Sequence, residues 1–134
     1  MARQVGRPDS ASQARLQVIL IALAVWNLLA FLASLISSGW FELAGDGLLS
    51  GRAFAGTTAV LAVAYLYAAR DPLRNRFVLW LAAVEQAVAL FSMAFHWVRD
   101  DVDGGDVWLP MLVSAVFLIL LIASMPRQTA TLRA

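Results

Sequence analysis

Four long apolar runs, separated by short polar segments, make up most of this chain. They lie at about residues 16–38, 53–69, 77–98 and 107–125, and the third helix is expected over residues 73–98. Crossing the roughly 30 Å hydrocarbon core of a bilayer takes about 17–25 helical residues, so each run has spanning length. None of them alternates apolar and polar residues as a half-buried strand would. The pattern predicts an all-α membrane protein, a four-transmembrane-helix antiparallel up-down bundle.

The segments outside the runs are short and polar. Residues 1–14 are expected to form a mobile cytoplasmic tail, residues 15–126 the bundle and residues 127–134 a cytoplasmic C-terminal tail, which leaves no length for a soluble domain. Asp71 suits a helix N-cap and Pro72 suits the first helical position. The third helix is therefore expected to begin there, slightly before its apolar run.

Arginines are distributed unevenly between the two ends of the predicted bundle, with eight on one side and Arg52 and Arg99 on the other. The eight are Arg3, Arg7, Arg15, Arg70, Arg74, Arg76, Arg127 and Arg133. Because basic residues accumulate in cytoplasmic loops, both termini are expected in the cytoplasm. The chain has no lysine, which we interpret as the composition of a GC-rich bacterial genome. The expected location is the bacterial inner (cytoplasmic) membrane, with several passes.

Composition excludes several classes of function. The chain is 61% hydrophobic and 14% charged, against roughly 45–50% and 25% in soluble domains. Cysteine is absent, which excludes disulfides, thiol redox chemistry and cysteine metal sites. Phosphate-binding and zinc-protease motifs are absent, so no metal site is expected. We interpret the arginine clusters as topology signals, and no nucleic-acid partner is expected.

Glu85 is the acidic residue that lies deepest in a predicted span. It follows Arg76 by nine residues, which at 1.5 Å per residue puts it roughly 13 Å deep, near the midplane. A carboxyl group at that depth costs free energy unless it is protonated, paired or hydrated. Small residues share its helical face, whereas bulky apolar residues from Trp80 to Val98 occupy the opposite face. Glu85 is therefore expected to point into the bundle.

Polar residues of the other predicted helices lie at similar depth, within roughly 13–18 Å of the cytoplasmic edge. We expect them to meet the carboxylate in one polar cluster. The expected cluster consists of Asn27, Thr57 (or Thr58), Glu85 with Gln86, and Ser114. Such side chains hold helices in register through hydrogen bonds worth roughly 0.6–2 kcal/mol each. For Glu85, binding of a proton, a cation or a ligand is the alternative to this structural role. A glutamine or serine at this position could hold the helices in register at a lower cost in free energy.

Two further residues share the helical face of that carboxylate. Ser92 lies about two turns further along, and His96, the single histidine, about three. Asp100 follows His96 by four residues, a spacing that suits a carboxylate–imidazole contact. An interfacial hydrogen bond is expected for His96, with an axial haem or quinone contact as the alternative. Tyr65 and Tyr67 are expected at the cytoplasmic interface.

Two short stretches and the layout resemble a known group of proteins. Residues 65–76 contain Ala-Arg-Asp-Pro-Leu-Arg, and residues 84–87 read Val-Glu-Gln-Ala. With four spans in 134 residues and cytoplasmic termini, the chain looks like the small bacterial four-helix membrane proteins of the DoxX-like and BphX-like kind. The resemblance implies the four-helix fold. Without lysine the chain lacks the glycine–lysine pair of the first DoxX helix, so no DoxX-type oxidoreductase partnership is implied.

Three functional interpretations follow. The first is a non-enzymatic accessory or hydrophobic-ligand-binding module whose interior centres on Glu85. The second is a small proton-coupled transporter, and the third a membrane enzyme of EXPERA-like or DoxX-like type. As acid and base, Glu85 and His96 would stand roughly 16 Å apart along one helix, too far to act on one atom. The expected partners are the lipid bilayer, a hydrophobic small molecule, and a second copy or a larger membrane complex, with no cofactor.

Overall fold

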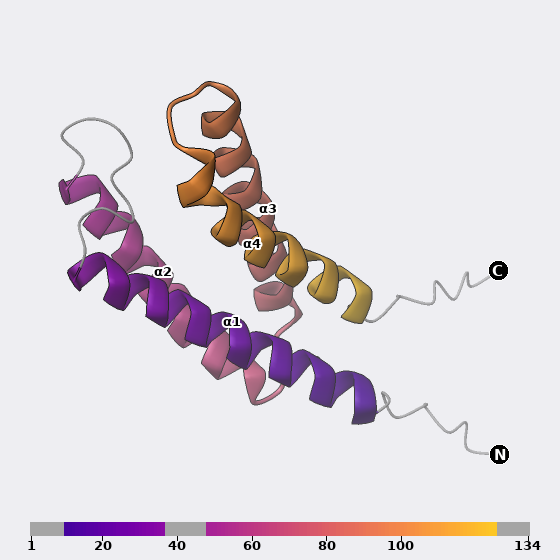
Figure 1. Cartoon of the computed structure of the whole chain (residues 1–134). Helices are drawn as coiled ribbons and strands as arrows, with labels where there is room; N and C mark the ends of the chain where they lie inside the picture. Colours follow the sequence, from indigo (N-terminus) through magenta and orange to yellow (C-terminus); the bar gives the residue numbers. More distant parts are fainter. Residues whose placement is uncertain (1–9, 37–47, 126–134) are drawn as a thin grey trace, which may run out of the picture.

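The computed structural model describes residues 10–36 and 48–125, with side chains described for residues 10–36 and 56–125. Within these residues all regular secondary structure is helical. The helices are α1 (Ser10–Ile36), α2 (Leu48–Ala69), α3 (Arg76–Val98) and α4 (Gly104–Ser124) (Figure 1). Helices α1, α3 and α4 are long and apolar enough to cross a membrane, and α2 has a shorter apolar segment, Gly56–Ala69. The predicted all-helical class is confirmed.

Three helices begin earlier than the apolar runs predict. Helix α1 begins at Ser10, so residues 10–14 are helical and do not belong to a mobile tail as expected. Helix α2 begins at Leu48 and α4 at Gly104, each before its run. Helical hydrogen bonding continues into polar residues at a membrane surface, and a hydropathy pattern marks only the apolar part. The expected end of the first helix at residue 38 and the tail 127–134 lie outside the described residues.

Helix α3 begins later than predicted, at Arg76. Asp71 does cap a turn, because its Oδ1 accepts from the Arg74 N–H at 3.2 Å and its carbonyl accepts from the Asn75 N–H at 3.2 Å. The chain leaves this single turn at Asn75, whose φ of −97° and ψ of 41° are not helical. The expected start near residue 73 is therefore wrong. Asp71 caps an isolated turn, and the long helix begins after that turn.

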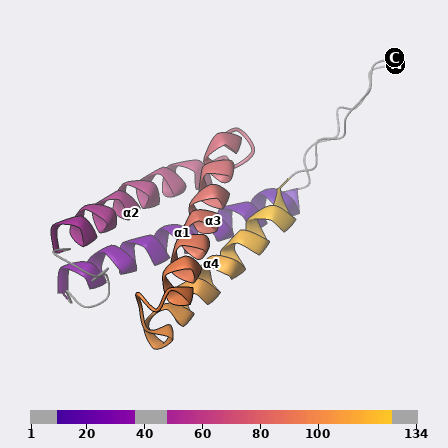
Figure 2. The ribbon, with the colours of Figure 1, turned by 90° about the horizontal axis from the view of Figure 1, so that it is seen from above.

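The four helices form two antiparallel hairpins. Helix α1 packs most extensively against α2, and α3 against α4, whereas the contacts of α1 with α4 and of α2 with α3 are much less extensive. Figures 1 and 2 show the hairpins from two directions. They lie against each other where α1 begins and α4 ends, and they diverge toward the connection between α3 and α4.

The buried apolar side chains gather where the hairpins meet. The largest fully buried ones in the helices are Leu16, Leu20, Leu23, Tyr65, Leu79 and Leu121. Alanines of α2 and α3 lie among them, at Ala62, Ala68, Ala69, Ala82 and Ala83. Small residues let membrane helices approach closely, so leucines of α1 and α4 can pack against alanine-lined backbones. This core holds the beginnings of α1 and α3 beside the end of α2.

Burial decreases along the inner face of α3. Ala82 is fully buried, Glu85 and Ala89 are half-buried, and Ser92 is exposed. These residues share one helical stripe, because three, four or seven positions bring a side chain back to nearly the same face. The stripe is therefore most buried at Ala82 and exposed at Ser92, whereas His96 at its end is half-buried. We call the segment from Ala89 to Ser92 the uncovered stripe.

The predicted outward face of α3 is exposed along the whole helix. It consists of Trp80, Val84, Val88, Phe91, Phe95 and Val98. Soluble monomers rarely expose apolar surface that is this continuous, so the face is suited to lipid. The exposed valines and leucines of α1, α2 and α4 continue it around the molecule.

Candidate functional site

Glu85 lies at the centre of a hydrogen-bond cluster contributed by three helices. Its Oε1 accepts from Asn27 Nδ2 of α1 at 3.0 Å. Its Oε2 accepts from the Tyr65 hydroxyl of α2 and from Gln86 Nε2 of α3, the latter at 3.1 Å. We call these four residues the Glu85 cluster. It joins both hairpins through one carboxyl group.

The donors of the Glu85 cluster are more deeply buried than the carboxyl group they contact. Tyr65, Asn27 and Gln86 have exposed fractions of 0%, 4% and 3%. Glu85 is half-buried. The three donors therefore form the enclosed part of the cluster, and Glu85 is its most accessible member.

The carboxylate is held by neutral donors. Within residues 10–36 and 56–125, the ion pairs involve only His96, Arg99 and Asp101, so no cation of this part of the chain neutralises Glu85. A carboxylate in an apolar environment without a cationic partner is costly, and this cost makes it receptive to a proton or a cation.

One buried polar atom next to the carboxylate lacks a partner. Gln86 donates through Nε2, but its Oε1 is buried without a hydrogen bond. A buried acceptor without a donor costs about 1–3 kcal/mol. Reversing the amide would direct its oxygen at the ionised carboxylate and lose the bond that Gln86 makes. The unpaired atom is thus a consequence of the contact with Glu85.

The remaining residues of the predicted cluster are placed differently. Ser114 is buried on α4 but makes no side-chain hydrogen bond within the described part of the chain. Thr57 is exposed, whereas Thr58 is buried. Thr58 precedes Tyr65 by seven positions and so shares its face, which Thr57 does not. Ser92 is exposed on the uncovered stripe.

Tyr65 is the cluster member that the sequence placed wrongly. It was expected at the cytoplasmic interface, but its side chain is fully buried and bonds Glu85. Tyr67, for which the same position was expected, is exposed. The position of Tyr65 around the helix could have predicted its burial. Tyr65 lies on the buried side of α2 together with Ala62, Ala68 and Ala69. A tyrosine on a small-residue face needs a partner for its hydroxyl.

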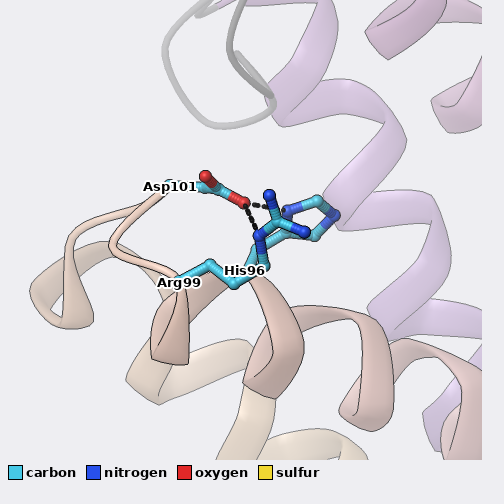
Figure 3. A network of polar contacts seen from close by, with 3 residues as sticks. All are labelled: His96, Arg99 and Asp101. Atoms are coloured by element: carbon cyan, nitrogen blue, oxygen red, sulfur yellow. Dashed lines mark hydrogen bonds and ion pairs between the residues drawn. The ribbon is translucent and has the colours of Figure 1, made fainter.

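His96 belongs to a separate network at the other end of α3. Its Nδ1 lies 3.0 Å from Asp101 Oδ2, and Arg99 Nε lies 3.5 Å from the same oxygen (Figure 3). The prediction that Asp100 contacts His96 is wrong. Asp100 has a φ of 57°, and this left-handed conformation reverses the chain at the end of α3. The Asp101 N–H donates to the His96 carbonyl at 3.0 Å and the Asp100 N–H to the Trp97 carbonyl at 3.1 Å. This Schellman motif brings Asp101 over the helix end.

The acidic connection that follows α3 stabilises helix ends. Asp103 is the N-cap of α4, and its side chain accepts from the Gly105 N–H at 2.7 Å. Asp106 lies in the first turn of α4, where a negative charge is favourable beside the positive end of the helix dipole. Within the described residues, no three His, Asp or Glu side chains gather as a metal ion would need.

Comparisons with protein-family models, with curated proteins and with solved structures find no match to this chain. The function therefore has to be argued from the Glu85 cluster and its surroundings.

Proposed function

We propose that this protein is a small integral membrane binding module that holds a hydrophobic molecule against the uncovered stripe of α3, with the Glu85 cluster as the polar contact. Four spans with both termini in the cytoplasm, in a bacterial inner membrane, are part of this proposal. The arginine distribution and the resemblance to DoxX-like and BphX-like proteins support it.

The observation that carries the proposal is the decrease in burial along one stripe of α3. Glu85 lies where the stripe changes from covered to uncovered, with Ala89 half-buried and Ser92 exposed beyond it. Ligand sites in helix bundles combine a mostly apolar surface with a few polar groups that fix orientation. An apolar chain along Ala89 and Ser92 would bring its polar end to Glu85.

Binding of 1-dodecanol, a neutral lipophile, tests the proposal. In phosphatidylcholine nanodiscs, a ligand that binds the folded state raises the melting temperature with concentration. We expect this rise for the wild type and its loss in Ser92→Trp, which fills the uncovered stripe. Phe91→Trp is the matched control, because Phe91 is exposed on the outward face. Equal stabilisation of wild type and Ser92→Trp would overturn the proposal.

A proton-coupled transporter is the second candidate, favoured by one observation. Glu85 is a half-buried carboxyl group without a cationic partner among the described residues, as a site that exchanges a proton for a substrate requires. Proton release from liposomes on addition of substrate, lost in Glu85→Gln, would distinguish transport from binding. The enzyme interpretation is less supported, because His96 bonds Asp101 at the far end of α3.

A further inference from the structure

The connection between α2 and α3 is a short turn that is anchored to the core. Pro72 is fully buried, and Leu73 packs against the buried apolar side chains. Asn75 Nδ2 donates to the Asp71 carbonyl at 2.9 Å, and Asp71 Oδ1 accepts from the Arg74 N–H. Because the core takes up the apolar side chains of this turn and hydrogen bonds hold its backbone, the turn presents its charged side chains to the surface in a defined arrangement.

Four exposed arginines lie at this end of the molecule. Arg70, Arg74 and Arg76 lie within the seven residues that join α2 to α3, and Arg15 lies in the second turn of α1, which begins at the same end (Figure 1). We call these four residues the basic end. Asp71 is the one acidic residue in residues 10–36 and 56–84, so the basic end and this aspartate together carry a net charge of +3.

The charges of the basic end are not compensated by the described part of the chain. Its ion pairs there involve His96, Arg99 and Asp101 at the other end of α3, and none of the four arginines. Like charges that lie close together repel one another, and an anion placed among them is attracted by all of them. The guanidinium group matches the geometry of phosphate, which it binds through paired N–H donors. The basic end is therefore suited to a phosphate group.

Exposed aromatic side chains adjoin the basic end. Phe77 and Trp80 follow Arg76 by one and four positions, and their exposed fractions are 77% and 62%. Four positions bring Trp80 to the same helical face as Arg76. Aromatic side chains beside basic ones are typical of the depth at which lipid headgroups meet acyl chains. A phosphate at the basic end that belongs to a lipid can thus place its acyl chains against Phe77 and Trp80, a contact that a free phosphate cannot make.

We infer that the basic end binds an anionic phospholipid, whose phosphate contacts the arginines while its acyl chains lie against Phe77 and Trp80. This site goes beyond the proposed binding at Glu85, which follows Arg76 by nine positions. It gives the arginines a role in addition to their topology signal. Because the arginines come from α1, from α3 and from the turn between α2 and α3, the bound lipid links the two hairpins where they lie against each other.

The test measures the melting temperature of the full chain in neutral dodecylmaltoside micelles. These are titrated with phosphatidylglycerol or with phosphatidylcholine of the same acyl chains, which carries no net charge. A lipid that binds the folded state raises the melting temperature with its concentration, and we expect this rise for phosphatidylglycerol alone. Equal stabilisation by the two lipids, or none by phosphatidylglycerol, would overturn the inference.

Substitution of the arginines locates the site. We expect Arg74→Gln to raise the dissociation constant of phosphatidylglycerol about fivefold, and Arg74→Gln combined with Arg76→Gln to raise it about 25-fold. Glutamine keeps the backbone N–H that bonds Asp71, and both arginine side chains are exposed, so the variants are expected to fold. Unchanged affinity of the double variant would overturn the inference.

Arg99→Gln is the control for general attraction between an anionic lipid and a positive charge. Arg99 is exposed and lies at the other end of α3, beside Asp101. We expect this variant to bind phosphatidylglycerol within about twofold of the wild type. A loss of affinity as large as that of Arg74→Gln would show that any arginine at the membrane surface has this effect, which contradicts a site at the basic end.

Glycerol 3-phosphate separates a lipid from a soluble anion. It carries the phosphate of the headgroup without acyl chains, and we expect it to leave the melting temperature unchanged at the concentrations at which phosphatidylglycerol raises it. Stabilisation by glycerol 3-phosphate as strong as that by phosphatidylglycerol would assign the basic end to a soluble phosphate and overturn the inference of a lipid.

Discussion

The hydroxyl of Tyr65 on α2 donates to the carboxylate of Glu85 on α3, across a pair of helices that meet over little surface. The two residues are 20 positions apart in the chain. Because Glu85 also accepts from Asn27 of α1, its carboxyl group connects three helices. The Glu85 carboxyl group is thus one point at which α1, α2 and α3 are linked by hydrogen bonds.

Tyr65→Phe is expected to destabilise the protein while leaving its core intact. The ring stays in place, but the carboxylate loses a buried donor, which costs about 1–2 kcal/mol. The free energy of unfolding in mixed micelles, measured by denaturant titration, checks this value. Tyr67→Phe is the matched control, since Tyr67 is exposed, and its change is expected to stay within about 0.5 kcal/mol. Equal effects of the two substitutions would contradict the structure.

Asn27 and Glu85 are expected to be energetically coupled. A double-mutant cycle with Asn27→Ala and Glu85→Gln measures the interaction free energy, expected at about 0.5–1.5 kcal/mol for a hydrogen bond between membrane helices. The same cycle with Ser114→Ala in place of Asn27→Ala is the control. Ser114 is buried but does not bond the cluster, so additivity within about 0.5 kcal/mol is expected. Coupling of Ser114 as strong as that of Asn27 would mean that the cluster extends to α4.

Asp103→Ala is expected to loosen the start of α4. The lost hydrogen bond to the Gly105 N–H removes an N-cap, which costs about 1 kcal/mol. Asp103→Asn retains an acceptor oxygen at the same place and is expected to restore most of the stability. Hydrogen exchange of the first amides of α4 measures the effect directly. Loss of protection in the asparagine variant to the same extent would show that the charge of Asp103, and not its capping bond, stabilises this end.

The proposed topology predicts which connections are accessible from outside the cell. The chain has no cysteine, so a single introduced thiol reports its own position. In intact bacterial cells, a membrane-impermeant maleimide is expected to label Asp106→Cys and not Arg74→Cys, because the arginine distribution predicts a cytoplasmic second connection. Both variants should be labelled after the membrane is permeabilised. The reverse pattern would invert the topology and leave the Glu85 cluster unchanged.

Helical phase and hydropathy were sufficient to predict much of the site. Glu85 was expected to face the protein and to meet Asn27 and Gln86, and these three residues are in hydrogen-bond contact. The outward face from Trp80 to Val98 is exposed, as its bulky apolar residues predicted. Both results follow from geometry within single helices, which repeats every 3.6 residues whatever the neighbours are.

The contacts that depended on bends in the chain were less predictable. Asp101, and not Asp100, reaches His96, because Asp100 adopts a left-handed conformation at the end of α3. Asp71 caps an isolated turn, and α3 begins only after Asn75. In both places a sequence spacing that assumes a continuous helix fails, since the backbone leaves the helix within that spacing.

By itself, the sequence determined that this chain is helical, apolar enough for a membrane, and equipped with one carboxyl group on the protein-facing side of its third apolar run. These properties depend on residue type and on local periodicity alone. Only the tertiary structure decided that Tyr65 supplies the donor from α2, that Ser114 does not join, and that burial stops midway along α3. Those outcomes depend on the angle at which the two hairpins meet. The packing of leucines against alanines at one end sets this angle, and the sequence of a single helix does not encode it.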